Sequence, residues 1–410
     1  MKNEYIFSEN PSTADALNEL RLKLSQSSRN AQLAFAFYGF EHDADLIRSS
    51  LGEMLGDAAI LGGSSHNGVM DSAAVRGSNS LGVYLIEDDT GDYGVGAAEY
   101  GDDPAAAAEA ALKQALERAD CLDQLPELVW VYQAPGFEDQ VLEGLNRVVG
   151  ERCPIVGGSA ADNDVSGKWS LFDNEMTMQN GVVVAVFFPS TAIGFAYQGG
   201  YEPNGHVGYV TRIEEQNKGQ MGRVTRVAGA EPRSRAILEI NNRPAAEVYN
   251  EWTNGAISDK LEAGGVILSE TNLAPIATLA GCSDGIDQYL LIHPESVRED
   301  GGLTTFASID LNAELYCMRG DPNQIIERAG RVVKLAKDQL YGAEPAGAIM
   351  VFCGGCRMAV GEHLSAAPGV VQEWIGDAPL ISCFTFGEQG PMMGKNSHGN
   401  LMISAIVFEA

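Results

Sequence analysis

Two stretches of the sequence, Ile60-Leu-Gly-Gly-Ser64 and Ile155-Val-Gly-Gly-Ser159, each end the same longer pattern. Upstream of both lie an apolar run, a Gly-Phe-Glu tripeptide and a helix-like stretch, over residues 33–38, 39–41 and 43–55 in the first copy and 128–132, 136–138 and 139–149 in the second. The apolar runs are predicted to be strands. Since the two serines are 95 residues apart, the sequence contains a duplicated strand-turn-helix-strand unit.

This duplication predicts the fold class. The strands of one unit are covered only when a neighbouring unit packs against them, so two copies are expected to share one core. Both copies continue past the glycine pairs into predicted strands, over 81–86 and 181–188. The fold is therefore predicted to be α/β, with duplicated modules that form layered mixed sheets. The first domain is expected over 1–220, with repeats at about 30–120 and 125–215.

A second α/β domain is predicted over 221–410. It is expected to contain a strand over 223–227 and an amphipathic helix over 322–340, whose apolar residues recur close to every 3.6 positions. The order of strand, glycine turn, helix and strand then returns, over 348–352, 353–357, 370–375 and 379–386. This order predicts a degenerate third copy of the unit.

The composition limits the classes of partner. A chain of 410 residues with a formal net charge of −29 repels nucleic-acid phosphates and anionic bilayers, so neither partner is expected. The acidity is also explained as a solubility adaptation. The longest strongly apolar run, 182–188, is too short to span a membrane, and the first ten residues lack a secretory signal, so the protein is expected to be cytoplasmic. Seven scattered cysteines fit reduced thiols.

The repeated glycine pairs have two interpretations. Glycine pairs occur in tight turns that merely pack, and also where a ligand approaches the backbone closely. Because two equivalent copies are present, the ligand interpretation and the packing interpretation are equally favoured. The predicted ligand-binding residues of these turns are Gly62, Gly63, Ser64, Ser65, Gly157, Gly158 and Ser159.

A charged pair in the second domain suggests a further site. Arg357 and Glu388 follow two predicted strands, where open α/β sheets collect ligands. An Arg can hold a carboxylate by two hydrogen bonds and a Glu can accept an ammonium group, which would suit an amino acid. The alternative is an internal ion pair between them. Asn400 and its neighbours Asn396 and Ser397 would complete either a site or a loop.

The order of these landmarks, from about residue 30 to 408, resembles the FIST family (F-box and intracellular signal transduction). The Gly-Gly-Ser stretches look like its N-domain, and 299–302, 353–357 and 386–388 look like its C-domain. The resemblance implies a sensory module that binds small molecules such as amino acids, and not an enzyme. Some stand-alone members are haemoproteins that sense nitric oxide and inhibit a partner kinase. Because no kinase is fused to this chain, its output is expected to pass through a separate histidine kinase or other signalling protein.

Haem b would need an axial ligand, most often a histidine, in an apolar pocket. Among the six histidines, His66 follows the first glycine pair and His398 lies near the last glycine-rich loop, so these two are the candidate haem ligands. The spacing of Cys353 and Cys356 allows thiol–disulfide exchange or half of a zinc site, or merely a packed turn, and no complete metal site is predicted. No catalytic motif is present. Haem-based nitric-oxide sensing is placed first, amino-acid sensing second, and a thiol redox response third.

Overall fold

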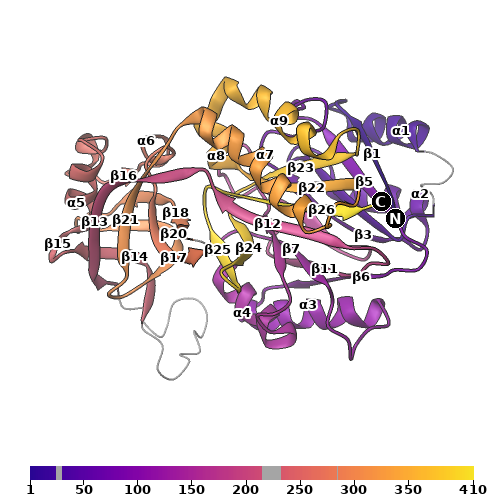
Figure 1. Ribbon diagram of the computed structural model, residues 1–410, viewed down its shortest axis with the longest axis horizontal. Coiled ribbons are helices and arrows are strands. Elements are labelled where there is room, and N and C mark those ends of the chain that lie inside the picture. Colours follow the sequence, from indigo (N-terminus) through magenta and orange to yellow (C-terminus); the bar gives the residue numbers. More distant parts are fainter. Residues whose placement is uncertain (25–29, 215–231, 284) are drawn as a thin grey trace.

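The computed structural model describes residues 1–24, 30–214, 232–283 and 285–410. The described chain forms three similar α/β modules around a shared core, with a smaller, strand-rich domain at one end (Figure 1). The predicted α/β class with layered mixed sheets is confirmed. No helix of the described residues has the length and apolar character needed to cross a bilayer.

Module 1 comprises β1 (Lys2–Ser8), α1 (Thr13–Lys23), β2 (Leu33–Gly39), α2 (Ala44–Leu55), β3 (Ala59–Ser65), β4 (Val69–Asp71) and β5 (Leu81–Glu87). Module 2 comprises β6 (Asp92–Glu99), α3 (Pro104–Arg118), β7 (Leu128–Gln133), α4 (Glu138–Val149), β8 (Ile155–Ser159), β9 (Leu171–Phe172), β10 (Thr177–Met178) and β11 (Gly181–Phe188). The order of elements in the two modules is nearly the same.

Module 3 comprises β12 (Ile193–Gly199), α7 (Pro322–Asp338), β22 (Pro345–Cys353), α8 (Gly354–Val360), the 3-10 helix η3 (Gly361–Ala366), α9 (Ala367–Ile375), β23 (Leu380–Thr385), β24 (Glu388–Met392), β25 (Lys395–Gly399) and β26 (Met402–Glu409). It follows the same plan, with the small domain inserted between β12 and α7. The predicted third copy is therefore present.

Each module has the same sheet plan. A helical connection joins two parallel strands, β2 to β3, β7 to β8 and β22 to β23, and the module's last strand, β5, β11 or β26, lies antiparallel to the first of the pair. The module's first strand, β1, β6 or β12, then pairs with that last strand. Predicted helices and strands mostly lie within two residues of these bounds.

The modules exchange edge strands in a cycle. β4 of module 1 pairs with β23 of module 3, β9 of module 2 pairs with β3 of module 1, and β24 of module 3 pairs with β8 of module 2. Each module thus completes the sheet of another, which gives the three modules a pseudo-threefold arrangement.

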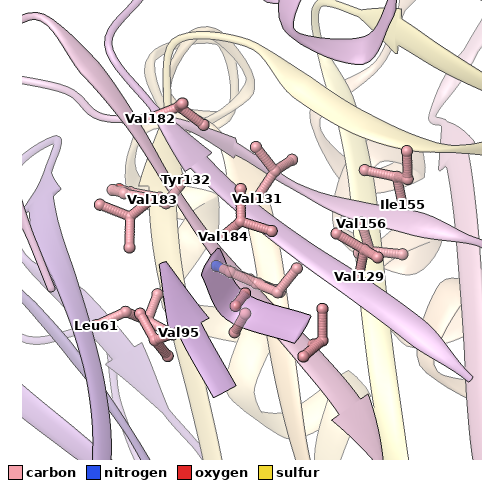
Figure 2. Close-up of a cluster of buried hydrophobic side chains, with 14 of the residues drawn as sticks. Leu61, Val95, Val129, Val131, Tyr132, Ile155, Val156, Val182, Val183 and Val184 are labelled. Atoms are coloured by element: carbon pink, nitrogen blue, oxygen red, sulfur yellow. The ribbon is translucent and has the colours of Figure 1, made fainter. Parts of the chain in front are cut away.

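The inner faces of the three sheets form one apolar core. Aromatic side chains connect the modules: Phe35 contacts Trp130 edge to face at 5.3 Å between ring centroids, and Phe408 stacks at 6.2 Å on both Tyr84 and Phe187. Figure 2 shows Leu61 of module 1 in the same cluster as valines of β7, β8 and β11. The expectation of a core shared between copies is confirmed, because burying these aromatic faces requires all three sheets.

Helices cover the outer faces. α2, α3 and α7 each begin directly after an aspartate, Asp43, Asp103 or Asp321, whose carboxylate accepts a backbone N–H of the first turn. α3 and α7 also have proline at their first position, where the missing N–H has no partner to lose. These caps fix where each helix starts, at the same edge of its sheet.

The small domain lies between Tyr201 and Gly320. Its sheet contains β13 (Tyr201–Ile213), β14 (Arg233–Ile240), β15 (Arg243–Pro244), β16 (Gly265–Val266), β17 (Ile276–Ser283), β18 (Ile286–Ile292), β19 (Pro294–Val297), β20 (Leu303–Asp310) and β21 (Glu314–Gly320), with α5 (Ala245–Trp252), the 3-10 helix η2 (Ser258–Lys260) and α6 (Leu268–Thr271) beside it. It has its own core, which includes Tyr249 and Trp252.

The sheets group the chain differently from the predicted repeats. β1 and α1, which begin module 1, precede the predicted start near residue 30, and β6 and α3 belong to module 2 rather than to the end of the first repeat. The strand predicted over 223–227 and the predicted boundary at 220/221 lie outside the described residues.

Candidate functional site

Three strands, β3, β8 and β23, end at one place, and their backbones are joined there in a closed ring. The ring consists of the N–H of His66 bonded to the carbonyl of Phe384 (3.0 Å), that of Ala161 to Ser64 (3.0 Å), and that of Phe386 to Ser159 (3.2 Å). Each bond joins one module to another. We call residues 64–66, 159–161 and 384–386 the three-strand junction.

The glycine pairs that precede the junction lie within strands, so the prediction that they form turns is wrong. Gly62 and Gly63 belong to β3, and Gly157 and Gly158 belong to β8. A Cβ on Gly63 would lie 2.3 Å from the ring of Tyr132, and the other three would meet Phe172, the backbone of Val131 and the side chain of Thr385 within 2.6 Å. Close packing between strands therefore requires glycine at these positions.

The serines of the junction are fully buried and hydrogen-bonded. Ser64 Oγ accepts the N–H of Ser170 at 3.0 Å, and Ser65 Oγ accepts the N–H of Phe384 at 2.8 Å while donating to the carbonyl of Gly68. Ser159 Oγ donates to Oε1 of Glu138 at 2.9 Å. These hydroxyls hold the junction together, and the prediction that they contact a ligand remains a prediction.

Arg357 lies beside the junction on α8. Cys353 is directly followed by this helix, where the sequence predicted a turn over 353–357. The guanidinium carbon lies 4.3 Å from the centroid of the Phe384 ring, and the side chain is half-buried. Burial lowers the pKa of Arg357 to about 10, so the group stays cationic at neutral pH.

The Arg357 guanidinium has no carboxylate partner among the described residues, and its buried Nη1 donates no hydrogen bond to any of them. Its one described side-chain partner is the face of Phe384. Buried cations are normally paired, because an unpaired charge out of water is costly. The predicted alternative of an ion pair with Glu388 is therefore absent from the described chain.

An aromatic and polar wall surrounds His66. Its Nδ1 lies 2.8 Å from the carbonyl oxygen of Asp162, and its Nε2 lies 2.8 Å from Nδ2 of Asn67. The imidazole ring contacts Phe386 at 5.8 Å, and Phe386 contacts Trp169 edge to face at 6.4 Å. Burial, with help from the positive charge of Arg357, lowers the pKa of His66 below its usual value, so the ring is neutral at pH 7.

Glu388 lies away from open solvent. It is fully buried, its Oε1 accepts the hydroxyl of Thr385 at 2.7 Å, and its Oε2 accepts the N–H of Met402 at 3.1 Å. Burial, and after it the nearby Cys353, raises the pKa of Glu388 well above its usual value. Asn400 is also buried and accepts the N–H of His293 at 3.3 Å. Both residues thus support the backbone behind the site.

The two cysteines of the Cys353-Gly-Gly-Cys356 motif are buried free thiols. Cys353 Sγ accepts the N–H of Leu401 at 3.3 Å, and burial raises the pKa of this thiol well above its usual value. No group of His, Cys, Asp and Glu suited to a metal ion occurs within the described part of the chain. The motif packs against Leu401, directly before β26, and its predicted redox role stays a prediction.

The two candidate haem ligands differ in their surroundings. Both ring nitrogens of His66 are occupied by hydrogen bonds, so its ring is not free to bind iron. His398 is buried, and its nitrogens hydrogen-bond to no residue that the structure describes, although Nδ1 lies 3.4 Å from Asp139. Its neighbours are polar, with Ser159 and Glu138 close to the same glycine, Gly387. These surroundings do not fit a haem, which binds in an apolar pocket.

An open cavity of about 550 Å³ lies elsewhere, between α7 and η3. It is lined by Asn323, Ile326, Glu327, Glu362, His363, Ser365 and Ala366. None of the predicted site residues lines it, and its walls are polar and acidic without the aromatic surface that the junction offers.

The match to known domain families covers most of the chain. The FIST N domain matches residues 32–219, and the FIST C domain matches residues 245–391. The chain belongs to the FIST family. FIST domains are sensor domains of signal transduction, and the predicted resemblance is confirmed at this level. In this FIST protein, both matched regions contribute to the three-strand junction: His66 and Ser159 come from the first, Phe384 and Phe386 from the second.

No curated protein matches the chain. Among solved structures, it is similar to a cyanuric acid hydrolase from A. caulinodans, with 8% identity, TM-score 0.38 and coverage of 100% of this chain and 99% of that one. A second cyanuric acid hydrolase has 9% identity, TM-score 0.34 and full coverage of both chains. PurLQS from Thermotoga maritima has 10% identity, TM-score 0.23 and coverage of 79% and 73%. At these scores the likeness supports no conclusion about activity.

Sequence reasoning selected Arg357 and His66 but not Phe384, Asp162 or Trp169, which surround them. Phe384 had a usable signal: it occupies in β23 the position of Ser64 in β3 and Ser159 in β8. Asp162 and Trp169 lie in a loop without a recognisable motif.

Proposed function

We propose that this FIST protein is a sensor that binds a small molecule with a carboxylate group, such as an amino acid, at Arg357 beside the three-strand junction. The observation that supports this proposal is the half-buried guanidinium that lies on the ring of Phe384 without a carboxylate partner in the described chain. A ligand carboxylate would neutralise this charge and accept two parallel N–H bonds.

The neighbours of Arg357 suit such a ligand. His66 is neutral at pH 7, so it adds no competing charge and can still offer polar contacts through its partners Asn67 and Asp162. Phe386, which is partly exposed, supplies apolar surface on which an aliphatic or aromatic side chain of the ligand can pack. The proposal names binding, and not catalysis, because the thiol of Cys353 and the hydroxyl of Ser159 are both buried and engaged.

The junction would pass the binding signal on. Three modules meet there through hydrogen bonds between their strand ends, so a ligand that shifts α8 or residue 384 changes how the modules pack. A signal requires that the ligand bind one arrangement more tightly than another. The partner that reads this change is proposed to be a histidine kinase or another signalling protein.

Haem binding with nitric-oxide sensing is the second candidate. One observation favours it: the ring nitrogens of His398 are unbonded within the described chain. Carboxylate binding is ranked above haem binding, because the surroundings of His398 are polar and both ring nitrogens of His66 are already hydrogen-bonded.

The test is a thermal-shift screen of the purified protein with the twenty standard amino acids and simple dicarboxylates. A ligand should raise the melting temperature of the wild type, because binding to the folded state stabilises it. Arg357→Met should abolish the rise, and Arg357→Lys should reduce it, since lysine keeps the charge but loses the planar fork. Arg319→Met, which changes an exposed arginine paired with Glu202, is the matched control and should keep the rise.

A negative screen, or a rise that survives in Arg357→Met, would contradict the carboxylate proposal. Incubation with haem tests the second candidate. A sharp Soret band that moves with nitric oxide and changes in His398→Ala would favour haem, and an unchanged spectrum would count against it.

A further inference from the structure

One position in module 2 departs from the pseudo-threefold pattern. In modules 1 and 3, two apolar side chains lie on the helix-covered face of the sheet at the junction, one on the first parallel strand and one on the exchanged strand: Tyr38 with Phe172, and Phe352 with Met70. Tyr38 and Phe172 stack at 6.0 Å. The equivalent residues on the sheet of module 2 are two glutamines, Gln133 of β7 and Gln389 of the exchanged strand β24.

The register places a histidine beside them. Gln389 lies directly opposite both Gly157 and His398, and Gln133 pairs with Ser159. Directly paired residues point to the same face, and so do residues two apart on one strand. The three side chains therefore share one face of the sheet, under the start of α4.

All three side chains are buried without satisfying their hydrogen-bonding groups. Gln133 and Gln389 are 0% exposed and His398 is 5% exposed. The amide oxygens and nitrogens of both glutamines and both ring nitrogens of His398 have no hydrogen-bond partner within the described residues. Leaving such groups unsatisfied is unfavourable, and native structures rarely do so. The other two sheets have Tyr38 with Phe172 and Phe352 with Met70 at these positions. The polar side chains on the sheet of module 2 therefore lower the stability of the unliganded fold.

The unsatisfied carboxamides of the two glutamines are balanced in donors and acceptors and carry no charge. Each carboxamide offers an acceptor and donors, and the imidazole adds two ring nitrogens. The carboxylates nearby already have partners: Glu138 accepts the N–H of Gly136 and the hydroxyl of Ser159, while Asp139 accepts the N–H of Ser308 and lies 3.4 Å from Nδ1 of His398, with which it forms an ion pair when the ring is protonated. A ligand for this cluster therefore needs both donors and acceptors and no net charge.

We propose that Gln133, Gln389 and His398 form a second binding site, for a small neutral molecule that carries a planar amide group. An amide N–H and C=O match the donors and acceptors of the carboxamides and the ring in one plane. This site is distinct from Arg357, whose ligand must be anionic, and it does not rest on the proposed function.

The small domain contacts the first turn of α4, which covers this site. Arg235 of β14 donates to the carbonyl of Gly136 at 3.1 Å and lies 3.9 Å from Glu138, and Ser308 of β20 contacts Asp139 at 3.3 Å. Both contacts are made at the first turn of α4. Entry of a ligand requires these contacts to loosen, so occupancy of the site is coupled to the position of the small domain.

The test uses acetamide as the probe and the full-length protein. Acetamide should raise the melting temperature of the wild type and shift the ring ¹⁵N signals of His398. Acetate is tested on the Arg357→Met variant, which lacks the proposed carboxylate site. There acetate should change neither the melting temperature nor the His398 signals. Gln389→Met copies Met70 of β4, the strand that module 1 adds to the sheet of module 3, and this variant and the double variant Gln133→Leu/Gln389→Met should lose both responses. The double variant should also melt higher than the wild type without ligand.

Two results would overturn the proposal. If acetamide changes neither the melting temperature nor the His398 signals of the wild type, and the double variant melts lower, the cluster holds structural water only. If the response to acetamide persists in the double variant, these side chains do not bind it. The Gln389→Met single variant, a change of one similar-sized side chain, decides the matter where the double variant fails to fold.

Discussion

The backbone N–H of His66 donates to the carbonyl oxygen of Phe384 at 3.0 Å, which joins the first module to the third. Two analogous bonds complete the ring, so no module can move at the junction without stretching a bond to another. The strands approach each other closely at this ring of hydrogen bonds, which explains why glycine is needed directly before it. A ligand that moves the backbone near Arg357 would therefore change the packing of all three modules.

The packing of Gly63 predicts a large loss of stability for Gly63→Ala. The new methyl group would lie 2.3 Å from the Tyr132 ring, and overpacking of this kind lowers the free energy of unfolding by about 1–3 kcal/mol. Gly52→Ala is the control, because a Cβ there meets nothing within 4 Å and alanine favours helix α2 by about 0.5–1 kcal/mol. Urea unfolding measures both. Equal stabilities of the two variants would contradict the strand packing.

Arg357→Met should stabilise the protein in the absence of ligand. The buried donor that finds no partner in the described chain costs about 1–3 kcal/mol, more than the roughly 0.5–1 kcal/mol that contact with Phe384 returns. The free energy of unfolding is therefore expected to rise by about 1 kcal/mol, measured against Arg319→Met as a surface control. A clear fall would show that Arg357 has a structural partner.

His293 predicts a loss of stability in acid. Burial lowers its pKa from 6.5 to about 4, so the unfolded chain binds this proton more readily than the folded one. Stability should fall as the pH drops from about 6.5 to about 4, in total by on the order of 3 kcal/mol. The measurement is the free energy of unfolding at a series of pH values, for the wild type and for His293→Gln. The variant should show a shallower slope, and identical slopes would exclude His293 as the cause.

Thiol labelling tests the Cys353-Gly-Gly-Cys356 motif. Cys282 is exposed, whereas Cys353 and Cys356 are buried, and burial raises the pKa of the Cys353 thiol. In the native protein an aromatic disulfide reagent should modify Cys282 quickly and the other cysteines only on unfolding. Cys282→Ser should remove the fast phase. If Cys353 or Cys356 instead reacts as fast as Cys282, a redox response becomes the better interpretation.

The sequence predicted the modular fold because its periodicities are strong. The run over 33–38 and its partner over 128–132 are apolar on both faces, as strands buried between a core and a helix layer must be. The glycine pairs were misassigned because glycine is typical of turns, and only the contact between Gly63 and Tyr132 shows that it also allows strands to approach. Cys353-Gly-Gly-Cys356 was misassigned for the same reason.

The site was predicted only in part. Arg357 has a recognisable charge, but it lies on α8, whereas Glu388 begins β24, which pairs with β8 of module 2. The spacing of the two residues in the sequence does not give this separation. Gln133 and Gln389 carry no motif at all. A comparison of Gln133 with Tyr38 across the 95-residue offset would have shown the exchange of an aromatic for an amide.

The small domain has a structural property that bears on its origin. Tyr201, its first residue, lies directly opposite Gly320, its last, in the pairing of β13 with β21. The chain thus leaves module 3 and returns to it at adjacent positions. An inserted domain with adjacent ends can be exchanged between homologues, or replaced by a short hairpin, while the three modules keep their architecture. Chimeras joined at Tyr201 and Gly320 would separate ligand binding by the three modules from signal output through the small domain.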